Sequence, residues 1–490
     1  MKFLSIDVGT TGCKCQLFSQ TGEILEYFFE EYDFRKEGDY NYVDVDAIWS
    51  ALKKMIAAVA KNHEISSFCV SSLGEACVLL DKDDNIVFYP MLYTDARGGE
   101  QAEYIEKTVG RKRAFEIAGV TPHNMFTISK ILWIKDAYPE KFAKIDKALL
   151  VCDYIGYLLS GERVIDYALA SRSGAFDIEK MEFSKELTED LGVPRSWFST
   201  PKRAGYIVGN IKKELCEELG LCGSPVLVLG SHDQVCTSIG AGILEAGDAV
   251  DGLGTVECIT TLFDKKLDDF ELGDMGYCCT PFGIEGLYCT YIVNYSCGSV
   301  INWFRKGIMH GYTGEKDNFF SYIESGMKEG PTGLLALPYF GGASTPYHDV
   351  NAKGAIINLT TQTTDSDVYK ALMESTAMEM RLNAEVMGKY GVHIKSAVAT
   401  GGGANSAKWL QLKADIQNIS YKILRSSEGG LCGCAMIQAV ALKSVKDYFE
   451  ARDVFVRYTK EFEPNKDSTE AYEGQYNKYK KLYKTLKEMY

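Results

Sequence analysis

Four short stretches of the sequence place residues suited to phosphate or proton chemistry directly after an apolar run. In the first, Asp7–Lys14 (DVGTTGCK), a carboxylate is followed by a Gly-Thr-Thr turn and a lysine. The hydroxyl and N–H groups of Thr10 and Thr11 can hold phosphate oxygens. Asp7 can hold a hydrated Mg²⁺, and Lys14 can neutralise phosphate charge. An ordinary polar hairpin turn is the alternative interpretation.

The second stretch, Gly252–Glu257 (GLGTVE), repeats the Gly-Thr corner in the second half of the chain. Gly254 and Thr255 can form a phosphate cradle of the same kind. Two such corners that face each other would enclose a triphosphate. The sequence contains no GxxxxGK[ST] loop, which excludes a Walker-type nucleotide site. It also lacks GxSxG and HExxH, so hydrolase and zinc-protease functions lose their main support.

The third stretch, Pro225–Gly242, carries a carboxylate at the end of a buried strand, Val226–Leu229. In an α/β sheet this edge is where ligands bind, and Asp233 can take a proton from a hydroxyl there. The alternative is a structural role, in which Ser231 or Asp233 caps the helix that follows.

The fourth stretch, Val398–Asn405 (VATGGGAN), joins an apolar run to a predicted helix through three glycines. Such a loop lets a flat ligand lie against bare backbone, although it is not the dinucleotide fingerprint GxGxxG. A flexible glycine turn is the alternative.

These stretches need strands and helices to position them, and the two halves of the chain provide similar ones. Lys2–Phe18 and Asp248–Phe263 each read as two antiparallel strands joined by a Gly-Thr turn. Strands alternate with helical periods, which predicts an α/β fold. We expect a duplicated α/β domain that divides near residue 245; one large irregular α/β domain is the alternative.

Three helices are predicted from their spacing. Asp46–Lys61 carries one apolar face, with Asp44 or Asp46 as N-cap, and Asp367–Tyr390 has a similar face. In Ser468–Met489, tyrosines recur at helical spacing, which predicts a stripe that packs on the body of the protein rather than a nucleic-acid site.

Composition excludes several classes of protein. The 490 residues carry a formal charge of −14 and are 46% hydrophobic, which is typical of a folded protein and disfavours a nucleic-acid partner. No apolar run is long enough to span a membrane or to form the core of a signal peptide. The 15 cysteines are scattered, without CxxC, and predict reduced, mostly buried thiols in the cytoplasm.

Taken in order, these stretches resemble the FGGY family of carbohydrate kinases, within the actin/hexokinase/heat-shock ATPase superfamily. The resemblance covers roughly Lys2 to Lys443. Besides the four stretches above, the matching segments are Met125–Asp136 with Lys130 and Trp133, Asp166–Ile178, the segment of Gly298 and Asn302, and Leu337–Tyr347. The sequence departs from the family pattern at Asn302, where glutamine is usual, at Gly342–Ser344, which replaces Gly-Glu-Arg, and near Asn358 in the second signature.

The resemblance implies two actin-like (ribonuclease H-like) domains, residues 1–244 and 245–490, with a catalytic cleft between them. It implies ATP-dependent phosphorylation of a terminal hydroxyl of a small ketose or polyol, with Asp233 as general base and Mg²⁺ held by Asp7 and Asp233. The implied ATP- and phosphate-binding residues are Thr10, Thr11, Lys14, Gly254, Thr255, Gly298, Asn302, Gly402, Gly403 and Asn405.

The resemblance also implies an acceptor site formed by Gly74, Glu75, Asp95, Met125, Asp233 and Gln234. The loop that contains Glu75 lacks the Met-His-Gly of typical xylulokinases. For Asp95 the alternative is a surface ion pair with Arg97. Relatives are usually homodimers, which is an analogy only.

A function from another class stays open at this point. The same superfamily contains chaperone ATPases and filament-forming proteins, which bind ATP without a sugar acceptor. Asp233 and the Met125–Asp136 segment favour the kinase. The expected ligands are therefore ATP, Mg²⁺ and a sugar or polyol, with neither nucleic acid nor membrane as a partner.

Overall fold

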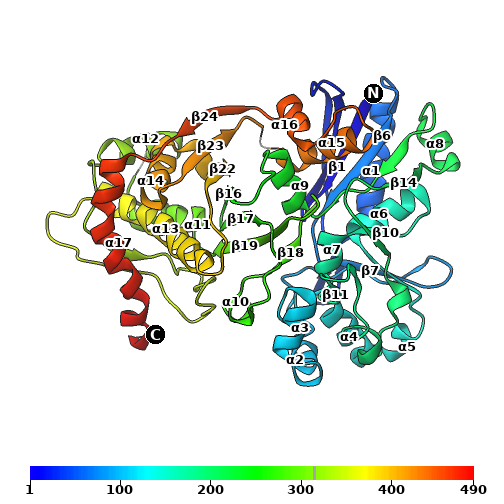
Figure 1. Cartoon of the computed structure of the whole chain (residues 1–490), viewed down its shortest axis with the longest axis horizontal. Helices are drawn as coiled ribbons and strands as arrows, with labels where there is room; N and C mark the ends of the chain where they lie inside the picture. Colours follow the sequence, from blue (N-terminus) through cyan, green and yellow to red (C-terminus); the bar gives the residue numbers. More distant parts are fainter. Residues whose placement is uncertain (313–315, 427, 490) are drawn as a thin grey trace.

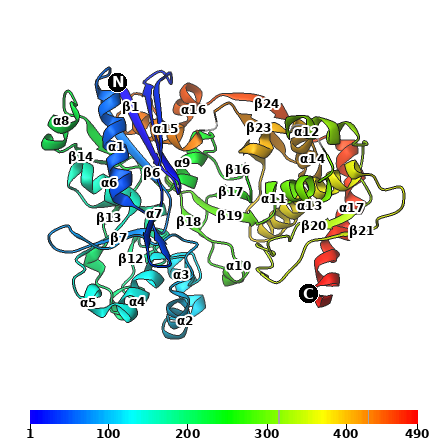
Figure 2. The same ribbon diagram turned by 180° about the vertical axis from the view of Figure 1, so that it is seen from behind.

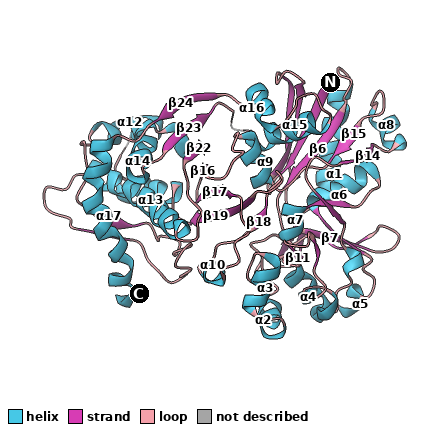
Figure 3. Cartoon of the chain, viewed as in Figure 1, coloured by secondary structure: helices cyan, strands magenta, loops and turns pink. Residues whose placement is uncertain are grey.

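The computed structural model describes residues 1–312, 316–426 and 428–489. Two mixed β-sheets, each flanked by helices, make up the two halves of the chain (Figures 1 and 3). This arrangement confirms the α/β class that the alternation of strands and helices predicted.

The first sheet has the strand order β14-β15-β6-β1-β2-β3. Its central strand β1 pairs antiparallel with β2 and parallel with β6, and β6 pairs parallel with β15. The strands are β1 (Lys2–Val8), β2 (Gly12–Ser19), β3 (Ile24–Glu31), β6 (Ser67–Ser72), β14 (Ile207–Asn210) and β15 (Val226–Val228).

The second sheet, with the order β18-β19-β17-β16-β22-β23-β24, repeats this pattern. Strand β16 pairs antiparallel with β17 and parallel with β22. Both predicted hairpins therefore form, and in each the first strand also pairs with a parallel strand from later in the chain. The strands are β16 (Asp248–Leu253), β17 (Glu257–Phe263), β18 (Thr280–Pro281), β19 (Tyr288–Asn294), β22 (Ser396–Thr400), β23 (Ser420–Leu424) and β24 (Tyr458–Phe462). The repeated topology agrees with a duplication; the boundary at residues 244 and 245 stays a prediction.

The three predicted helices form, with small shifts at their ends. Helix α1 (Val45–Ala60) begins at Asp44, whose carboxylate accepts a hydrogen bond from the Ala47 N–H. Helix α13 (Asp365–Gly388) begins at a capping box on Thr364. Helix α17 (Lys466–Leu486) buries the tyrosine stripe, which confirms a packing role.

Helices α9 (Asp233–Gly240) and α15 (Gly429–Ala441) join the two halves. A Cβ atom on Gly240 would lie 1.9 Å from the carbonyl oxygen of Gly429, and one on Gly433 would lie 1.9 Å from that of Cys236. Only glycine permits this approach. Although α15 comes late in the chain, it contacts β1 and β6 of the first sheet, and both views show it beside them (Figures 1 and 2).

The other elements surround the two sheets. The remaining helices are α2 (Gly99–Thr108), α3 (Arg111–Ala118), α4 (Thr127–Ala137), α5 (Pro139–Phe142), α6 (Val151–Ser160), α7 (Tyr167–Ser171), α8 (Lys213–Leu219), α10 (Phe270–Asp274), α11 (Gly298–Trp303), α12 (Lys316–Ser325), α14 (Ala407–Gln417) and α16 (Tyr448–Phe455). The remaining strands are β4 (Arg35–Glu37), β5 (Tyr40–Tyr42), β7 (Cys77–Leu80), β8 (Ile86–Phe88), β9 (Lys147–Leu150), β10 (Val164–Asp166), β11 (Phe176–Asp177), β12 (Glu182–Phe183), β13 (Thr200–Lys202), β20 (Leu335–Leu337) and β21 (Ala355–Ile357).

Two predictions from composition can be compared with this structure. All 15 cysteines are free thiols and most are buried, as expected. Among the described residues, no helix has the length and apolar character needed to cross a bilayer.

Candidate active site

Asp233 is the first residue of α9, at the carboxyl edge of the first sheet. The chain reaches it from β15 by passing so close to β6 that a Cβ on Gly230 would lie 1.8 Å from the Val70 carbonyl oxygen. His232 then forms an isolated bridge with Ser72, the last residue of β6. This path fixes the position of Asp233 next to the ends of β6 and β1.

The capping alternative for this segment is wrong. His232 occupies the N-cap position of α9, and no side chain caps the helix. The Ser231 hydroxyl instead donates to Asp166, with 2.7 Å between the oxygens. Asp233 Oδ1 is buried and has no hydrogen-bond donor among the described residues. Burial raises the pKa of Asp233 to about 8, and the nearby Asp7 carboxylate contributes to the rise. A carboxyl group with this pKa is well matched to proton transfer near neutral pH.

Asp7 lies near the end of β1, beside the same edge. Its Oδ1 accepts a hydrogen bond from the Ser71 hydroxyl, with 2.6 Å between the oxygens. Burial raises its pKa, while Ser71 and Lys14 act in the opposite direction. Asp7 and Asp233 are thus two neighbouring carboxylates whose charged forms disfavour each other.

This pair fits a divalent cation. Mg²⁺ would bind the carboxylate oxygen of Asp233 that has no hydrogen-bond donor. Its positive charge would also offset the repulsion between Asp233 and Asp7. Within the described part of the chain, no group of three or more His, Cys, Asp or Glu residues could hold a metal ion. The remaining ligands would have to be phosphate oxygens and water, which is how Mg²⁺ usually binds beside a nucleotide.

The first Gly-Thr corner is held by its own backbone and by one tyrosine. The Gly9 N–H donates to the Gly12 carbonyl, and the Tyr32 hydroxyl donates to the Gly9 carbonyl. Thr11 is exposed and Thr10 is half-buried, so both residues are in contact with solvent. Lys14 is not free in this arrangement, because its ammonium donates to Glu428, with 2.7 Å between the atoms.

The second corner is supported by the start of α11. The Gly298 N–H donates to the Gly254 carbonyl, and a Cβ at position 298 would lie 2.6 Å from that oxygen. Gly298 is therefore required by packing, and its N–H is already engaged. Thr255 is exposed on the corner, and Asn302 is exposed on α11.

A buried cation lies beneath this corner. Lys413 on α14 contacts Asp251 on β16 at 3.0 Å and also pairs with Glu257 on β17, and all three side chains are fully buried. Although burial alone would lower the pKa of Lys413, the two carboxylates raise it. The Tyr421 hydroxyl also donates to Asp251. Sequence reasoning missed this cluster, since only the fold brings residue 413 next to residues 251 and 257.

The triple-glycine stretch forms the predicted link between a strand and a helix, from β22 to α14. A Cβ on Gly402 would meet open space. One on Gly403 would lie 2.8 Å from the Leu253 Cβ and 3.3 Å from the Trp409 ring. Gly402 therefore presents bare backbone, whereas Gly403 is a packing position. Asn405 is exposed at the end of the loop.

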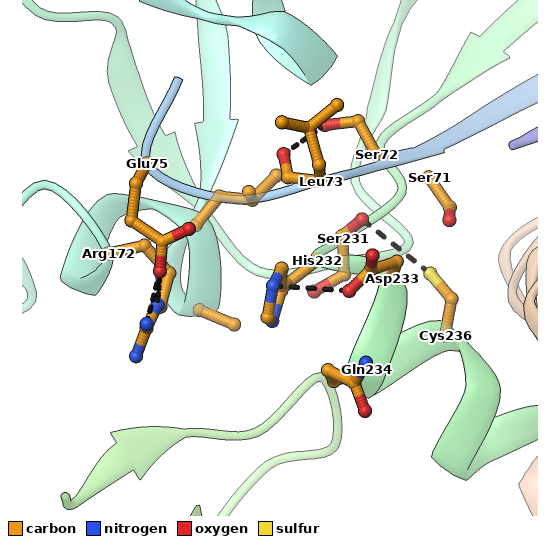
Figure 4. A network of polar contacts seen from close by, with 12 residues as sticks. Ser71, Ser72, Leu73, Glu75, Arg172, Ser231, His232, Asp233, Gln234 and Cys236 are labelled. Atoms are coloured by element: carbon orange, nitrogen blue, oxygen red, sulfur yellow. Dashed lines mark hydrogen bonds and ion pairs between the residues drawn. The ribbon is translucent and has the colours of Figure 1, made fainter. Parts of the chain in front are cut away.

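Glu75 and Arg172 form a buried ion pair beside Asp233 (Figure 4). The Arg172 Nε donates to Glu75 Oε1 at 2.5 Å, and Glu75 has a left-handed backbone with φ of 58°. A Cβ on Gly74 would lie 3.4 Å from the Arg172 Cγ. Arg172 is a partner that sequence reasoning did not assign, although it lies in the Asp166–Ile178 segment.

Asp95 pairs with Arg97, as the alternative interpretation predicted, but the pair is not on the surface. The Arg97 and Asp95 side chains are 8% and 14% exposed, and their closest atoms are 2.6 Å apart. Burial opposes ionisation, yet the hydrogen bonds from Arg97 lower the pKa of Asp95 overall. Met125 is partly buried just before α4, and Gln234 is exposed beside Asp233 (Figure 4).

His232 is a second residue of this site that sequence reasoning left without a role. Its Nε2 lies 3.2 Å from Asp233 Oδ1, and its Nδ1 lies 3.2 Å from the hydroxyl of Tyr291 on β19. Burial, with the charge of Arg172, lowers the pKa of His232 to about 3, so the ring is neutral.

Comparisons with known proteins identify the family and the fold of this chain. The N-terminal domain of the FGGY family of carbohydrate kinases matches residues 2–240, and its C-terminal domain matches residues 254–442. A xylulose kinase from Staphylococcus epidermidis is 27% identical over 494 residues, covering 99% of this chain and 97% of that enzyme. A gluconokinase from Bacillus subtilis is 24% identical, covering 96% and 93%. The crystal structure of a xylulose kinase from Rhodospirillum rubrum superposes with a TM-score of 0.92 at 22% identity, covering 100% of this chain and 99% of that one, which shows the shared fold.

Proposed function

The chain belongs to the FGGY family of carbohydrate kinases, and from this premise we propose that it transfers the γ-phosphate of ATP to a terminal hydroxyl of a neutral open-chain ketose such as a pentulose. The observation that carries the proposal is Asp233. Its carboxylate has a buried oxygen without a donor, beside both Asp7 and the Glu75 loop. A sugar or polyol kinase is what the matched relatives have in common.

In the proposed mechanism, Asp233 accepts the proton of the acceptor hydroxyl as that oxygen attacks the γ-phosphorus, and the bond from the γ-phosphorus to the bridging oxygen breaks so that ADP leaves with the electron pair. The raised pKa of Asp233 means that it can hold this proton at neutral pH until it is released to solvent. Asp7, together with Asp233, would hold Mg²⁺, which supplies positive charge to the phosphate oxygens.

The nucleotide is proposed to lie between the two corners. The exposure of Thr11 and Thr255 and the partial exposure of Thr10 support phosphate binding at the two corners. The open space at Gly402 supports an adenine site on the loop from β22 to α14, with Asn405 at its end. Lys14 would reach phosphate only by leaving Glu428.

A neutral acceptor is favoured over a sugar acid because the nearby cations already have partners. Arg172 is neutralised by Glu75, and Arg97 is neutralised by Asp95. Lys130 donates to the backbone carbonyls of residues 95 and 97. The carboxylate of a bound sugar acid would have to break one of these contacts. The hydroxyls of a ketose can instead donate hydrogen bonds to Glu75 while both ion pairs stay intact.

The test is ADP formation by the purified protein with D-xylulose, D-ribulose, glycerol, D-gluconate or no acceptor. We expect turnover that depends on a ketose, with kcat/KM at least roughly tenfold above that for gluconate, because an unpaired charge costs more than about 1.4 kcal/mol. ADP release that is equal with and without acceptors would refute the kinase proposal in favour of an ATPase without a sugar. A preference for gluconate would refute only the neutral acceptor.

A further inference from the structure

A histidine and a tyrosine connect the two sheets next to Asp233. Tyr291 belongs to β19 of the second sheet, and His232 follows β15 of the first. The imidazole Nδ1 lies 3.2 Å from the tyrosine hydroxyl. Its Nε2 lies 3.2 Å from Asp233 Oδ1 on the other side (Figure 4). No other residue of the site makes polar contact both with Asp233 and with the second sheet, within the part of the chain that the structure describes.

The imidazole is held tightly in this position. His232 is only 7% exposed, and a Cβ on Gly74 would lie 3.0 Å from its Nε2. Its backbone is fixed by the bridge to Ser72. On the other side, the Arg172 guanidinium lies 5.7 Å from the centre of the Tyr291 ring. The ring therefore has little freedom to rotate away from either partner.

Hydrogen-bond chemistry assigns the ring proton. A neutral imidazole has one donor and one acceptor nitrogen, and an ionised carboxylate only accepts. Once Asp233 is ionised, as a general base must be before it accepts a proton, Nε2 therefore carries the ring proton toward it, and Nδ1 accepts from the Tyr291 hydroxyl. The present contact to Oδ1 is not aligned as a full hydrogen bond, since that oxygen has no donor. A small rotation about the soft terminal torsion of Asp233 would complete it.

We infer that His232 is a positioning residue, which holds one oxygen of Asp233 so that the other faces the acceptor hydroxyl, and that Tyr291 fixes the tautomer of His232 needed for this. The inference rests on the proposed function, in which Asp233 is the base. It makes the orientation of the base depend on a residue of the second sheet. Correct placement of Asp233 therefore requires the two halves of the chain to be together.

The test is Tyr291→Phe, which removes the hydroxyl but keeps the ring beside Arg172. Losing one hydrogen bond of ordinary strength should lower kcat about threefold to tenfold. The KM for ATP should stay within about twofold, because the hydroxyl contacts no nucleotide-binding residue. Tyr288→Phe, the same change three positions earlier on β19, is the matched control and should leave kcat unchanged.

A second variant and a spectroscopic measurement separate positioning from simple packing. His232→Gln keeps a donor and an acceptor and should retain more activity than His232→Phe, which keeps a ring but neither group. Nitrogen NMR of isotope-labelled histidine, recorded at a pH above the Asp233 pKa of about 8 so that the carboxyl is ionised, should show Nε2 protonated in the wild-type protein and a mixture of tautomers in Tyr291→Phe. The signal that disappears in His232→Gln identifies residue 232 among the six histidines.

Two results would overturn the inference. One is a Tyr291→Phe variant with wild-type kcat and an unchanged tautomer. The other is a rise in the sugar KM of the His232 variants at unchanged kcat, which would make His232 a ligand of the acceptor. If Asp233→Asn stays active, the proposed function itself fails; if that variant is inactive while Tyr291→Phe is normal, only the positioning role fails.

Discussion

Replacing Asp233 by asparagine keeps the size and shape of the side chain and removes only its ability to accept a full proton. If Asp233 is the general base, kcat should fall by about 10²–10⁴-fold, the usual contribution of such a group. The fold should not suffer, because no side chain caps α9 and Oδ1 has no donor to lose. Since burial and Asp7 both disfavour the carboxylate, the melting temperature should be equal to or above that of the wild type.

The assay is sugar-dependent ADP release, with ATP affinity measured separately by equilibrium binding. Asp264→Asn, which makes the same change at an exposed position, is the control and should behave as wild type. A turnover of Asp233→Asn within about threefold of wild type, far below the range for a general base, would refute the role of Asp233. A large loss of melting temperature would instead show that the carboxylate is structural, and a loss of ATP binding at unchanged melting temperature would assign Asp233 to the Mg²⁺ site rather than to proton transfer.

Three further predictions concern the nucleotide loop and two buried ionisable side chains. Gly402→Asp should raise the KM for ATP roughly tenfold or more at unchanged melting temperature, because a carboxylate would face the nucleotide; Gly403→Ala should instead lower the melting temperature, because its Cβ would clash with Leu253. Lys413→Met should lower the free energy of unfolding, measured in urea, by about 3–5 kcal/mol, because it leaves two buried carboxylates without their cation. An unchanged unfolding midpoint would contradict this. Burial raises the pKa of Asp153 to about 8, so between pH of about 4 and 8 the folded protein holds a proton that the unfolded chain has lost, and stability falls with rising pH by up to about 1.4 kcal/mol per unit. Asp153→Asn should remove that part of the slope, measured by urea unfolding across this range, and an identical slope would show that Asp153 is ionised when folded.

Patterns that repeat over a few residues were predicted correctly from the sequence alone. The two Gly-Thr corners predicted the two hairpins, and the apolar spacing predicted α1. Its N-cap was predicted as Asp44 or Asp46, and the structure has Asp44. The strand before Asp233 and the triple-glycine loop also formed as expected. These features depend on backbone preferences and on the period of the side chains, both of which are local.

The partners of the site residues depended on the tertiary structure. Glu75 meets Arg172, 97 positions away, and Lys14 meets Glu428, 414 positions away. The assignment of Gly402 to open space and of Gly403 to packing depends on Leu253, which belongs to another strand. No local pattern encodes such contacts, because they are set by how the two sheets and their helices pack.

The sequence by itself therefore determined the family, the α/β class and the places along the chain of the residues suited to phosphate and proton chemistry. Eight short motifs in order, together with their local periodicity, suffice for that. The tertiary structure alone decided which charges are neutralised, which glycine is open, and that Tyr291 reaches His232 beside Asp233. The physical reason is that burial and pairing of a side chain are set by residues distant in the chain. Only the folded path brings those residues within hydrogen-bond distance.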